Sequence, residues 1–327
     1  MEFERRDMVV GMLGLPLLMT GCAGARGVSA PGRSALYPLS VYGAKGVVEL
    51  APVLLAVRDI FPAGTVVHPG GAANLVSADN VADVATNAET QALRFSARRP
   101  DMRIIMTVAE GLYRIVARRS AGISSVADLR GKRVATLTLT SAGYFLSRML
   151  AREGMSIADV TIVQPMPIPA MVTAIANREA DAIAMWEPHS ENAVHALGDD
   201  AVEFSGAGVY RELFNLNSTA GALADPDKRR AIVALVRAIM DATSAMNRNP
   251  AQAQAMVVQA GGYTPEEVAR CWKHQAFTAG FADDMLDVMT QEEQWLAERE
   301  GRPARSRADL APLIDRSVYE EARALRS

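Results

Sequence analysis

A short segment that occurs twice is the feature that most constrains how this chain can fold. One copy, residues 82–89, reads ADVATNAE, and the other, residues 180–187, reads ADAIAMWE and is followed by Pro188. Each copy starts at Ala-Asp, continues as a small apolar strand and ends at a polar tip with a carboxylate. Each also follows another apolar strand by about 40–50 residues. Two similar α/β units predict two lobes that face each other, and a cleft between lobes is a natural place to hold a small molecule.

The composition allows a large core and excludes some classes of partner. Half of the 327 residues are apolar, which is enough for an extensive buried interior. The formal net charge is −3 and the Lys and Arg residues form no block, which argues against a nucleic-acid surface. We therefore expect no nucleic-acid partner.

The N-terminus reads as an export signal. Arg5 and Arg6 precede a 12-residue apolar run at 8–19, which is shorter than the about 20 residues of a spanning helix. The run ends in Met-Thr-Gly-Cys, which resembles a bacterial lipobox with Cys22 as the lipidated residue. We expect a signal peptide at 1–21, a flexible Gly/Ala/Ser-rich tether at 22–35 and a lipid-anchored periplasmic protein.

Alternatives remain open at this end of the chain. The Arg pair also resembles a twin-arginine signal, so the sequence decides neither the Sec nor the twin-arginine route, nor which membrane holds the anchor. Cys22 could also be an ordinary residue of a cleaved leader. No other apolar run approaches 18 residues.

Strands and helices alternate over the first two thirds of the chain, which predicts parallel or mixed sheets. Strands are expected at 36–42, 65–68, 82–86, 102–108, 112–117, 133–137, 160–163 and 180–184. Helices are expected at 47–60, 89–98, 144–153, 170–177 and 188–197. Beyond residue 215 the pattern predicts helices only, at 227–247, 251–259, from 264, 284–298 and 310–325, packed around the first lobe.

Two loops place a strand end next to a helix N-terminus. One consists of Gly43, Ala44, Lys45 and Gly46, and the other spans 138–143 with Thr138, Ser141 and Ala142. The free N–H groups and dipole of a helix N-terminus favour an anion or polar acceptor, and small residues let a ligand approach the backbone. Neither loop is a Walker A or GxGxxG motif, so no nucleotide is indicated. An ordinary turn is the alternative for each.

Polar strand tips complete the set of candidate binding residues. They are Asn87, Glu89, Glu110, Gly111, Trp186 and Glu187, to which the Pro-rich loop 165–169 adds Met166. Trp186 offers a flat apolar face with an N–H donor, and Met suits an adaptable apolar surface. Glu89 and Glu187 could instead be helix-start carboxylates, and Trp186 and Met166 could serve packing alone.

The sequence contains few motifs that would indicate catalysis or metal binding. The four histidines form no HExxH pattern, and no CxxC or GxSxG occurs. Cys271, the one cysteine after Cys22, reads as a packed thiol rather than a nucleophile. We therefore expect a protein that is not an enzyme, with no cofactor, no metal and no catalytic residue.

Two motifs resemble a known family. Residues 128–135, DLRGKRVA, resemble the DLKGKKVA stretch that opens the second lobe of bacterial ABC-transporter solute-binding proteins. Asp181-Ala182 through Trp186-Glu187-Pro188 resembles the DA…WEP of their sulfonate, taurine, nitrate and thiamine-precursor branch, the NMT1/THI5-like proteins. The likeness covers roughly residues 36–300.

The resemblance implies an α/β, type II periplasmic-binding-protein fold. Two Rossmann-like lobes on a two-stranded hinge enclose a cleft, with a helical C-terminal extension on lobe one. Lobe one is expected at 36–120 and 216–327, and lobe two at 121–215. Ligand contacts are implied for the 43–46 loop, for Asn87 to Glu89 and for Glu110-Gly111 from lobe one. From lobe two or near the hinge they are implied for Thr138, Ser141, Ala142, Trp186 and Glu187.

The implied function is that of a non-catalytic solute-binding component of an ABC importer, which closes on a small organic ligand and delivers it to a membrane permease. A monomer is expected. Lys45 could meet an acid while the 165–169 loop is apolar, so we expect an organic ligand with an apolar body, anionic or aromatic, whose identity and charge stay open. The alternatives are an enzyme on the same fold, of thiamine-pyrimidine or menaquinone-pathway type, and a tethered ligand sensor.

Overall fold

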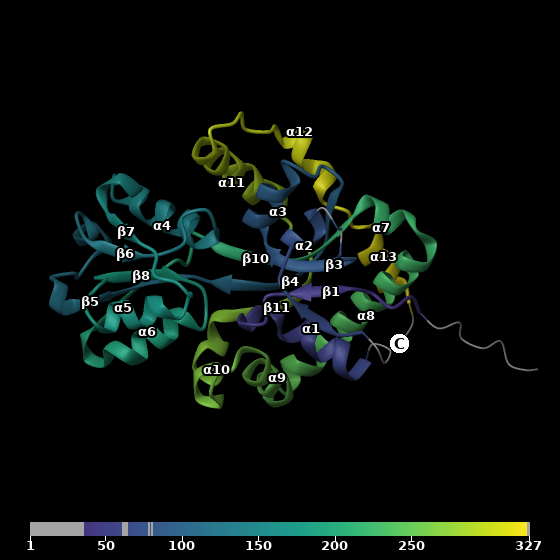
Figure 1. Ribbon diagram of the computed structural model, residues 1–327, viewed down its shortest axis with the longest axis horizontal. Coiled ribbons are helices and arrows are strands. Elements are labelled where there is room, and N and C mark those ends of the chain that lie inside the picture. The colour runs from purple at the N-terminus through teal and green to yellow at the C-terminus, as the bar shows by residue number, and fades with distance from the viewer. Residues whose placement is uncertain (1–35, 61–64, 78, 80, 326–327) are drawn as a thin grey trace, which may run out of the picture. The chain divides into compact units, whose positions relative to one another are not determined.

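The structure is a computed structural model that describes residues 36–60, 65–77, 79 and 81–325 (Figure 1). The expected signal peptide, the tether and Cys22 lie outside the described residues. In the described part the strands form two sheets. No helix there is long and apolar enough to cross a bilayer.

The first sheet has six strands in the order β11-β4-β10-β3-β1-β2. These are β1 Val41–Gly43, β2 Val67–Pro69, β3 Val84–Ala88, β4 Met102–Leu112, β10 Arg211–Thr219 and β11 Gln275–Gly280. Strands β2, β1 and β3 are parallel, whereas β10 and β11 run antiparallel to their neighbours.

The second sheet has five strands in the order β7-β6-β8-β5-β9. These are β5 Arg114–Arg118, β6 Arg133–Ala135, β7 Thr161–Val163, β8 Ala182–Met185 and β9 Ala201–Ser205. Here β7, β6 and β8 are parallel and β5 is antiparallel to both of its neighbours. The parallel triple β7-β6-β8 therefore repeats β2-β1-β3, and the duplicated segment supplies the third strand in both.

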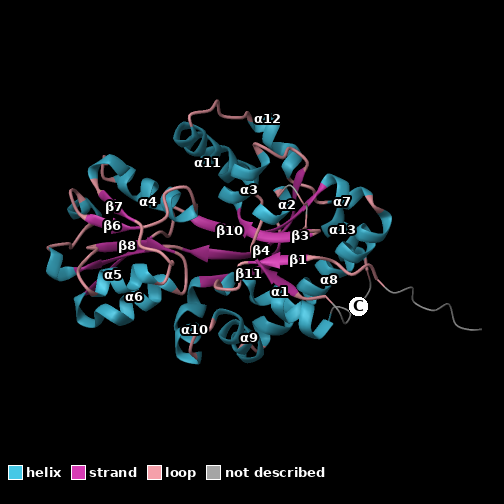
Figure 2. Cartoon of the chain, viewed as in Figure 1, coloured by secondary structure: helices cyan, strands magenta, loops and turns pink. Residues whose placement is uncertain are grey.

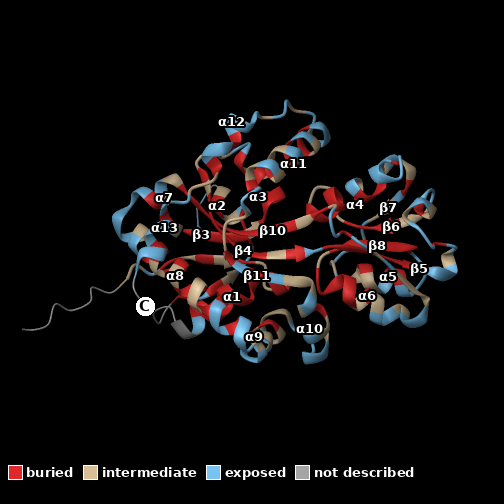
Figure 3. Cartoon of the chain, turned by 180° about the vertical axis from the view of Figure 1, so that it is seen from behind, coloured by how far each residue is buried: buried red, intermediate tan, exposed pale blue. Residues whose placement is uncertain are grey.

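Helices cover the faces of both sheets (Figures 1 and 2). They are α1 Ala51–Leu55, α2 Ala73–Val76, α3 Glu89–Ser96, α4 Ser141–Arg152, α5 Ala170–Ala176, α6 His189–Leu197, α7 Ala220–Ala224, α8 Pro226–Arg248, α9 Ala251–Gly261, α10 Pro265–Cys271, α11 Met285–Glu300, α12 Arg307–Leu310 and α13 Ser317–Ala324. Helices α1, α8 and α9 pack on one face of the first sheet, and α2, α3 and α11 on the other. Figure 3 shows that the strands and the inner helix faces are buried.

The sequence pattern missed three strands, β9, β10 and β11. In β10 the buried positions 217 and 218 hold the polar residues Asn217 and Ser218, so the sequence lacks the apolar run expected of a buried strand. Their side chains donate hydrogen bonds to the backbone oxygens of Ala85 (3.1 Å) and Asp83 (2.8 Å). The expected all-helical region beyond 215 was therefore wrong at β10 and β11, since β11 adds an edge strand to the first sheet. The expected helix at 310–325 is also interrupted, by a 3₁₀ turn that contains Pro312.

The chain passes between the two sheets at two places that lie side by side. Tyr113 alone separates β4 from β5, and residues 206–210 separate β9 from β10. The Gly206 N–H donates a hydrogen bond to the Tyr113 carbonyl oxygen (2.8 Å), which links the two crossings. The boundary expected at 120 lies beyond β5, and the one at 215 lies within β10, so the division into lobes at these residues stays a prediction.

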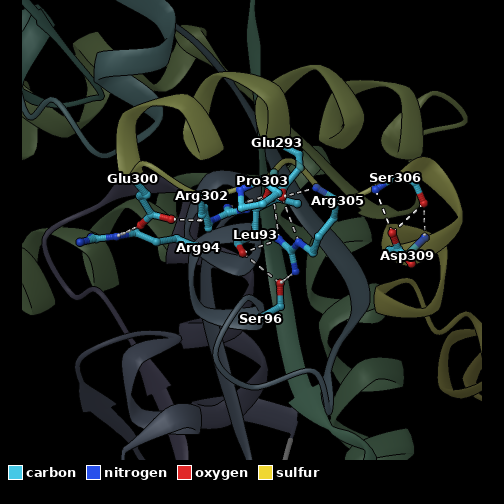
Figure 4. A network of polar contacts seen from close by, with 10 residues as sticks. All are labelled: Leu93, Arg94, Ser96, Glu293, Glu300, Arg302, Pro303, Arg305, Ser306 and Asp309. Carbon is cyan, nitrogen blue, oxygen red and sulfur yellow. Dashed lines mark hydrogen bonds and ion pairs between the residues drawn. The ribbon is translucent and has the colours of Figure 1, made fainter.

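A buried carboxylate fastens the segment after α11 to α3 (Figure 4). Glu293 on α11 accepts ion pairs from Arg302 (2.5 Å) and Arg305 (2.8 Å), and its side chain is fully buried. Arg305 also donates to the Leu93 carbonyl oxygen (2.7 Å) and to Ser96 Oγ (2.9 Å) at the end of α3. Burial raises the pKa of Glu293, but the two guanidinium groups outweigh it and hold that pKa at about 2.

Glu293→Gln should lower the free energy of unfolding at pH 7 by about 3–5 kcal/mol, because it leaves Arg305 without its charged partner. The folded-state pKa of Glu293 lies below the ordinary value of 4.5, so its contribution is present above pH 4.5 and is lost as the pH falls towards 2. Urea unfolding at pH 7 and pH 3 should show a smaller gap between wild type and variant at pH 3. Glu298→Gln, an exposed site on the same helix, should change stability by less than about 0.5 kcal/mol. An equal loss in both variants would contradict this assignment.

Candidate functional site

A cavity with about 410 Å³ of empty space, its open mouth included, lies at strand ends of both sheets. Its lining residues are Ala44, Val47, Glu49, Asn87, Ala88, Gln91, Thr140, Ser141, Trp186, Glu212 and Phe214. Most follow the carboxyl ends of the parallel strands β1, β3, β6 and β8, which is where open α/β sheets hold their ligands.

Four of the residues predicted from sequence line this cavity, namely Ala44, Asn87, Ser141 and Trp186. Gly43, which ends β1, and Lys45 and Gly46, which follow Ala44 in the loop, do not line the cavity. Gly43 packs closely, since a Cβ there would lie 2.6 Å from Leu50 Cδ1. The Gly46 carbonyl oxygen accepts a hydrogen bond from Tyr263 Oη (2.9 Å).

Several other predicted residues lie around or away from the cavity. Thr138 and Ala142 flank the lining residues Thr140 and Ser141. Glu110 and Gly111 line a separate hollow of about 480 Å³ near Arg211 and His274. Met166 is 64% exposed and lines neither space. The binding roles given to all these residues stay predictions.

Polar contacts of buried side chains tie the 138–143 loop to α3 and to the crossing at Tyr113. Gln91 on α3 donates from Nε2 to the Leu139 carbonyl oxygen (2.9 Å). Tyr113 Oη and Ser141 Oγ, in the first turn of α4, share a hydrogen bond (2.9 Å). The start of α4 is thus held by α3 and by the crossing between β4 and β5.

Glu89 lies beneath the cavity wall. It is fully buried and accepts hydrogen bonds from Tyr210 Oη (2.5 Å) and from the Leu213 N–H (2.8 Å). Burial raises the pKa of Glu89, and the hydrogen bonds oppose that shift. In this arrangement the carboxyl group holds the start of α3 against β10.

Glu187 belongs to a buried ionic network around Arg114. The guanidinium contacts Glu187 (2.8 Å), Glu191 (2.6 Å) and Glu203 (2.8 Å). Burial raises the pKa of Glu187 to about 7, although Arg114 opposes the shift. The Glu191 carboxyl is also desolvated, but Arg114 outweighs burial and lowers its pKa. The network fixes the strand end that presents Trp186.

Two carboxyl groups that the sequence reasoning missed lie in the cavity lining. Glu49 is 1% exposed and Glu212 is 5% exposed. Among the described residues, Oε2 of each is buried without a hydrogen-bond partner. Glu49 follows the 43–46 loop at the start of a helical stretch, and this position could have identified it as a candidate site residue. Glu212 lies in β10, whose strand character the sequence did not reveal.

Within the described residues, no three His, Cys, Asp or Glu side chains are grouped so that they could hold a metal ion. Cys271 is buried and donates from Sγ to the Val268 carbonyl oxygen (3.2 Å). Burial raises the pKa of this thiol well above its ordinary value, so little of the reactive thiolate is available.

Arg114→Met should lower the free energy of unfolding by about 3–5 kcal/mol, because Glu187 is left buried without its cation and Glu191 keeps only the more distant Arg270 (4.0 Å) and His274 (3.5 Å). Arg130→Met offers a matched control, since Arg130 is 59% exposed and pairs with Asp159 at the surface. The control should lose at most about 1 kcal/mol. Urea unfolding of both variants at pH 7 tests this, and similar losses in the two would refute a special role for the network.

The chain belongs to the NMT1/THI5-like family, whose model matches residues 65–253, more than half of its length. It is similar to a protein of Brucella abortus (strain 2308) that is named as a binding protein, with 33% identity over 90 residues. That match covers 24% of this chain and only 28% of the relative.

Solved structures share the fold. The periplasmic aliphatic sulphonate binding protein SsuA from Escherichia coli aligns with a TM-score of 0.66 at 17% identity, over 81% of this chain and 88% of that one. The desulfurization enzyme DSZB aligns with a TM-score of 0.57 at 13% identity, over 86% of this chain and 98% of that one. The expected periplasmic-binding-protein fold is therefore confirmed.

Proposed function

We propose that this NMT1/THI5-like protein is the solute-binding component of an ABC importer. It captures a small organic ligand between its two α/β units and delivers it to a membrane permease, without catalysis. The family, and the fold shared with a periplasmic sulphonate-binding protein, support this proposal.

The observation that carries the proposal is the cavity with walls from both sheets. Ala44 and Asn87 come from loops of the first sheet, whereas Ser141 and Trp186 come from loops of the second. A ligand that contacts both walls favours the closed arrangement over an open one, since it gains both sets of contacts only there. A permease can then distinguish the loaded protein from the empty one.

The export signal expected at 1–21 and the lipobox-like Cys22 support a proposal for where the protein works. We propose that it is anchored by a lipid on Cys22 and acts in the periplasm as a monomer. Labelling with a fatty-acid analogue in an expressing bacterium should mark the wild type and leave Cys22→Ala unlabelled.

An enzyme on the same fold is the second candidate, favoured by the likeness to DSZB. The buried, hydrogen-bonded thiol of Cys271 speaks against a cysteine nucleophile there. Incubation of the purified protein with the molecule it binds separates the two candidates. Return of that molecule unchanged supports transport, and its conversion supports the enzyme.

Native purification followed by mass spectrometry should find a small molecule bound to the wild type. Trp186→Ala should lower the affinity for it by about tenfold to a hundredfold, because truncation of an apolar face in contact with a ligand costs about 1.5–3 kcal/mol. Val66→Ala is the control, since that side chain is exposed outside the cavity and was not a candidate binding residue. If the Trp186→Ala variant bound the small molecule as well as the wild type does, the ligand site would not lie in this cavity.

A further inference from the structure

A hollow separate from the cavity has a basic lining. It encloses about 740 Å³ of empty space, its open mouth included. It is lined by Arg94, Arg98, Arg299, Arg302, Glu300 and Leu139. Four arginines thus accompany a single glutamate, on a chain whose formal net charge is −3. The hollow therefore gathers positive charge against the overall balance of the chain, which favours an anionic partner there.

Two of the four arginines are held in place by acids. Glu300 accepts a contact from Nε of Arg94 (3.1 Å) and another from Nε of Arg302 (2.9 Å), as Figure 4 shows. Arg302 also pairs with the buried Glu293, which Arg305 shares. These contacts set three arginines against two acids, so one positive charge is left over. Arg94 uses only its Nε, and the described residues offer its two Nη groups no partner.

The other two arginines of the lining are exposed. Within the part of the chain that the structure describes, neither Arg98 nor Arg299 has an ion pair. The Arg299 guanidinium lies over the ring of Trp295, 5.3 Å from its centre. Stacking on an aromatic face orders a guanidinium and leaves its in-plane N–H groups available to a carboxylate. Because such a side chain is already ordered, it loses less entropy when a partner binds.

Both α/β units contribute to this hollow. Arg94 and Arg98 come from α3 and the residues after it, beside the first sheet, whereas Leu139 belongs to the loop between β6 and α4. Gln91 lines the cavity and donates its hydrogen bond to the Leu139 carbonyl oxygen (2.9 Å). One hydrogen bond therefore joins a wall of the cavity to a wall of the hollow. A partner in the hollow contacts both units only while they are held together in this way.

We propose that this basic hollow is the docking site for an acidic segment of the membrane permease, which places Asp or Glu side chains between the arginines. The inference rests on the proposed function and names the chemistry of its protein partner. Arginine pairs with carboxylates in a bidentate way, and complementary charge steers and orients partners. A concave site fits a protruding segment better than a flat lipid surface. Contact with Leu139 lets the permease distinguish the closed arrangement, since that residue belongs to the second unit.

A labelled acidic peptide tests the charge preference of the hollow. We expect fluorescein-labelled hexaglutamate to bind the wild type at least about tenfold more tightly than labelled hexaglutamine, in fluorescence anisotropy at pH 7 and about 50 mM NaCl. Arg98→Glu/Arg299→Glu should weaken the hexaglutamate complex by at least about tenfold, because two attractive contacts become repulsive. Added salt should weaken binding to the wild type and change binding to the variant little.

Arg230→Glu/Arg323→Glu is the matched control, since it changes the net charge equally through exposed arginines of α8 and α13. It should keep the wild-type affinity for hexaglutamate within about threefold. Both double variants should keep the wild-type unfolding midpoint, because all four side chains are exposed. An equal loss of affinity in the two variants would overturn the inference. So would a wild type that sediments with phosphatidylglycerol vesicles and ignores the peptide.

A photo-crosslinker identifies the partner in the native bacterium. p-Benzoylphenylalanine in place of Ala97, an exposed residue of the lining, should join to an Asp- or Glu-containing segment of a polytopic membrane protein, sequenced by mass spectrometry. The same group in place of Ala245, exposed on α8, should not join to that segment. Cross-links from position 97 only to lipid, or only to segments without acidic residues, would overturn the inference.

Failure of the proposed function gives a different result. Conversion of the bound molecule during incubation rejects transport, whatever the peptide does. Hexaglutamate binding that survives the Arg98→Glu/Arg299→Glu reversal rejects the acidic partner at this hollow and leaves the solute-binding role in place.

Discussion

Edge-to-face packing of aromatic rings at the two crossings holds the functional region together. Tyr113 and Tyr210 lie on the two crossings with ring centroids 5.3 Å apart, and Phe145 and Tyr144 of α4 pack against them at 5.6 and 5.5 Å. Such ring pairs add about 0.5–1.5 kcal/mol beyond their area burial. The hydroxyl groups of the same tyrosines reach Ser141 and Glu89, so this cluster sets the positions of both cavity walls.

The buried carboxyl groups near the cavity differ in the direction of their pKa shifts. Glu89 and Glu292 are both fully buried, and burial raises the pKa of each. Glu293, the next residue on α11, is equally buried but is ionised by its two arginines. Adjacent residues on one helix thus carry one acid whose pKa is raised by burial and another whose pKa is lowered by two arginines.

The parts of the structure that could be read from sequence are those carried by local pattern. The duplicated segment correctly predicted two α/β units, and its polar tips led to Asn87 and Trp186 in the cavity lining. Glu212 escaped because its strand is defined by long-range pairing with β3 and β4 rather than by alternation. Glu187 was predicted as a ligand contact or a helix-start carboxylate, and its pairing with Arg114 could not be foreseen because Arg114 lies 73 residues away along the chain.

The repeated strand order has a consequence for how such a protein can change its ligand. The strand end at Trp186 packs in the core of the second sheet, whereas the strand end at Asn87 is supported by separate apolar clusters around the first. Substitutions in well-separated clusters act on stability nearly additively. Under the proposed function, substitutions in one wall would therefore leave the structure of the other wall intact, so that ligand specificity could change one wall at a time.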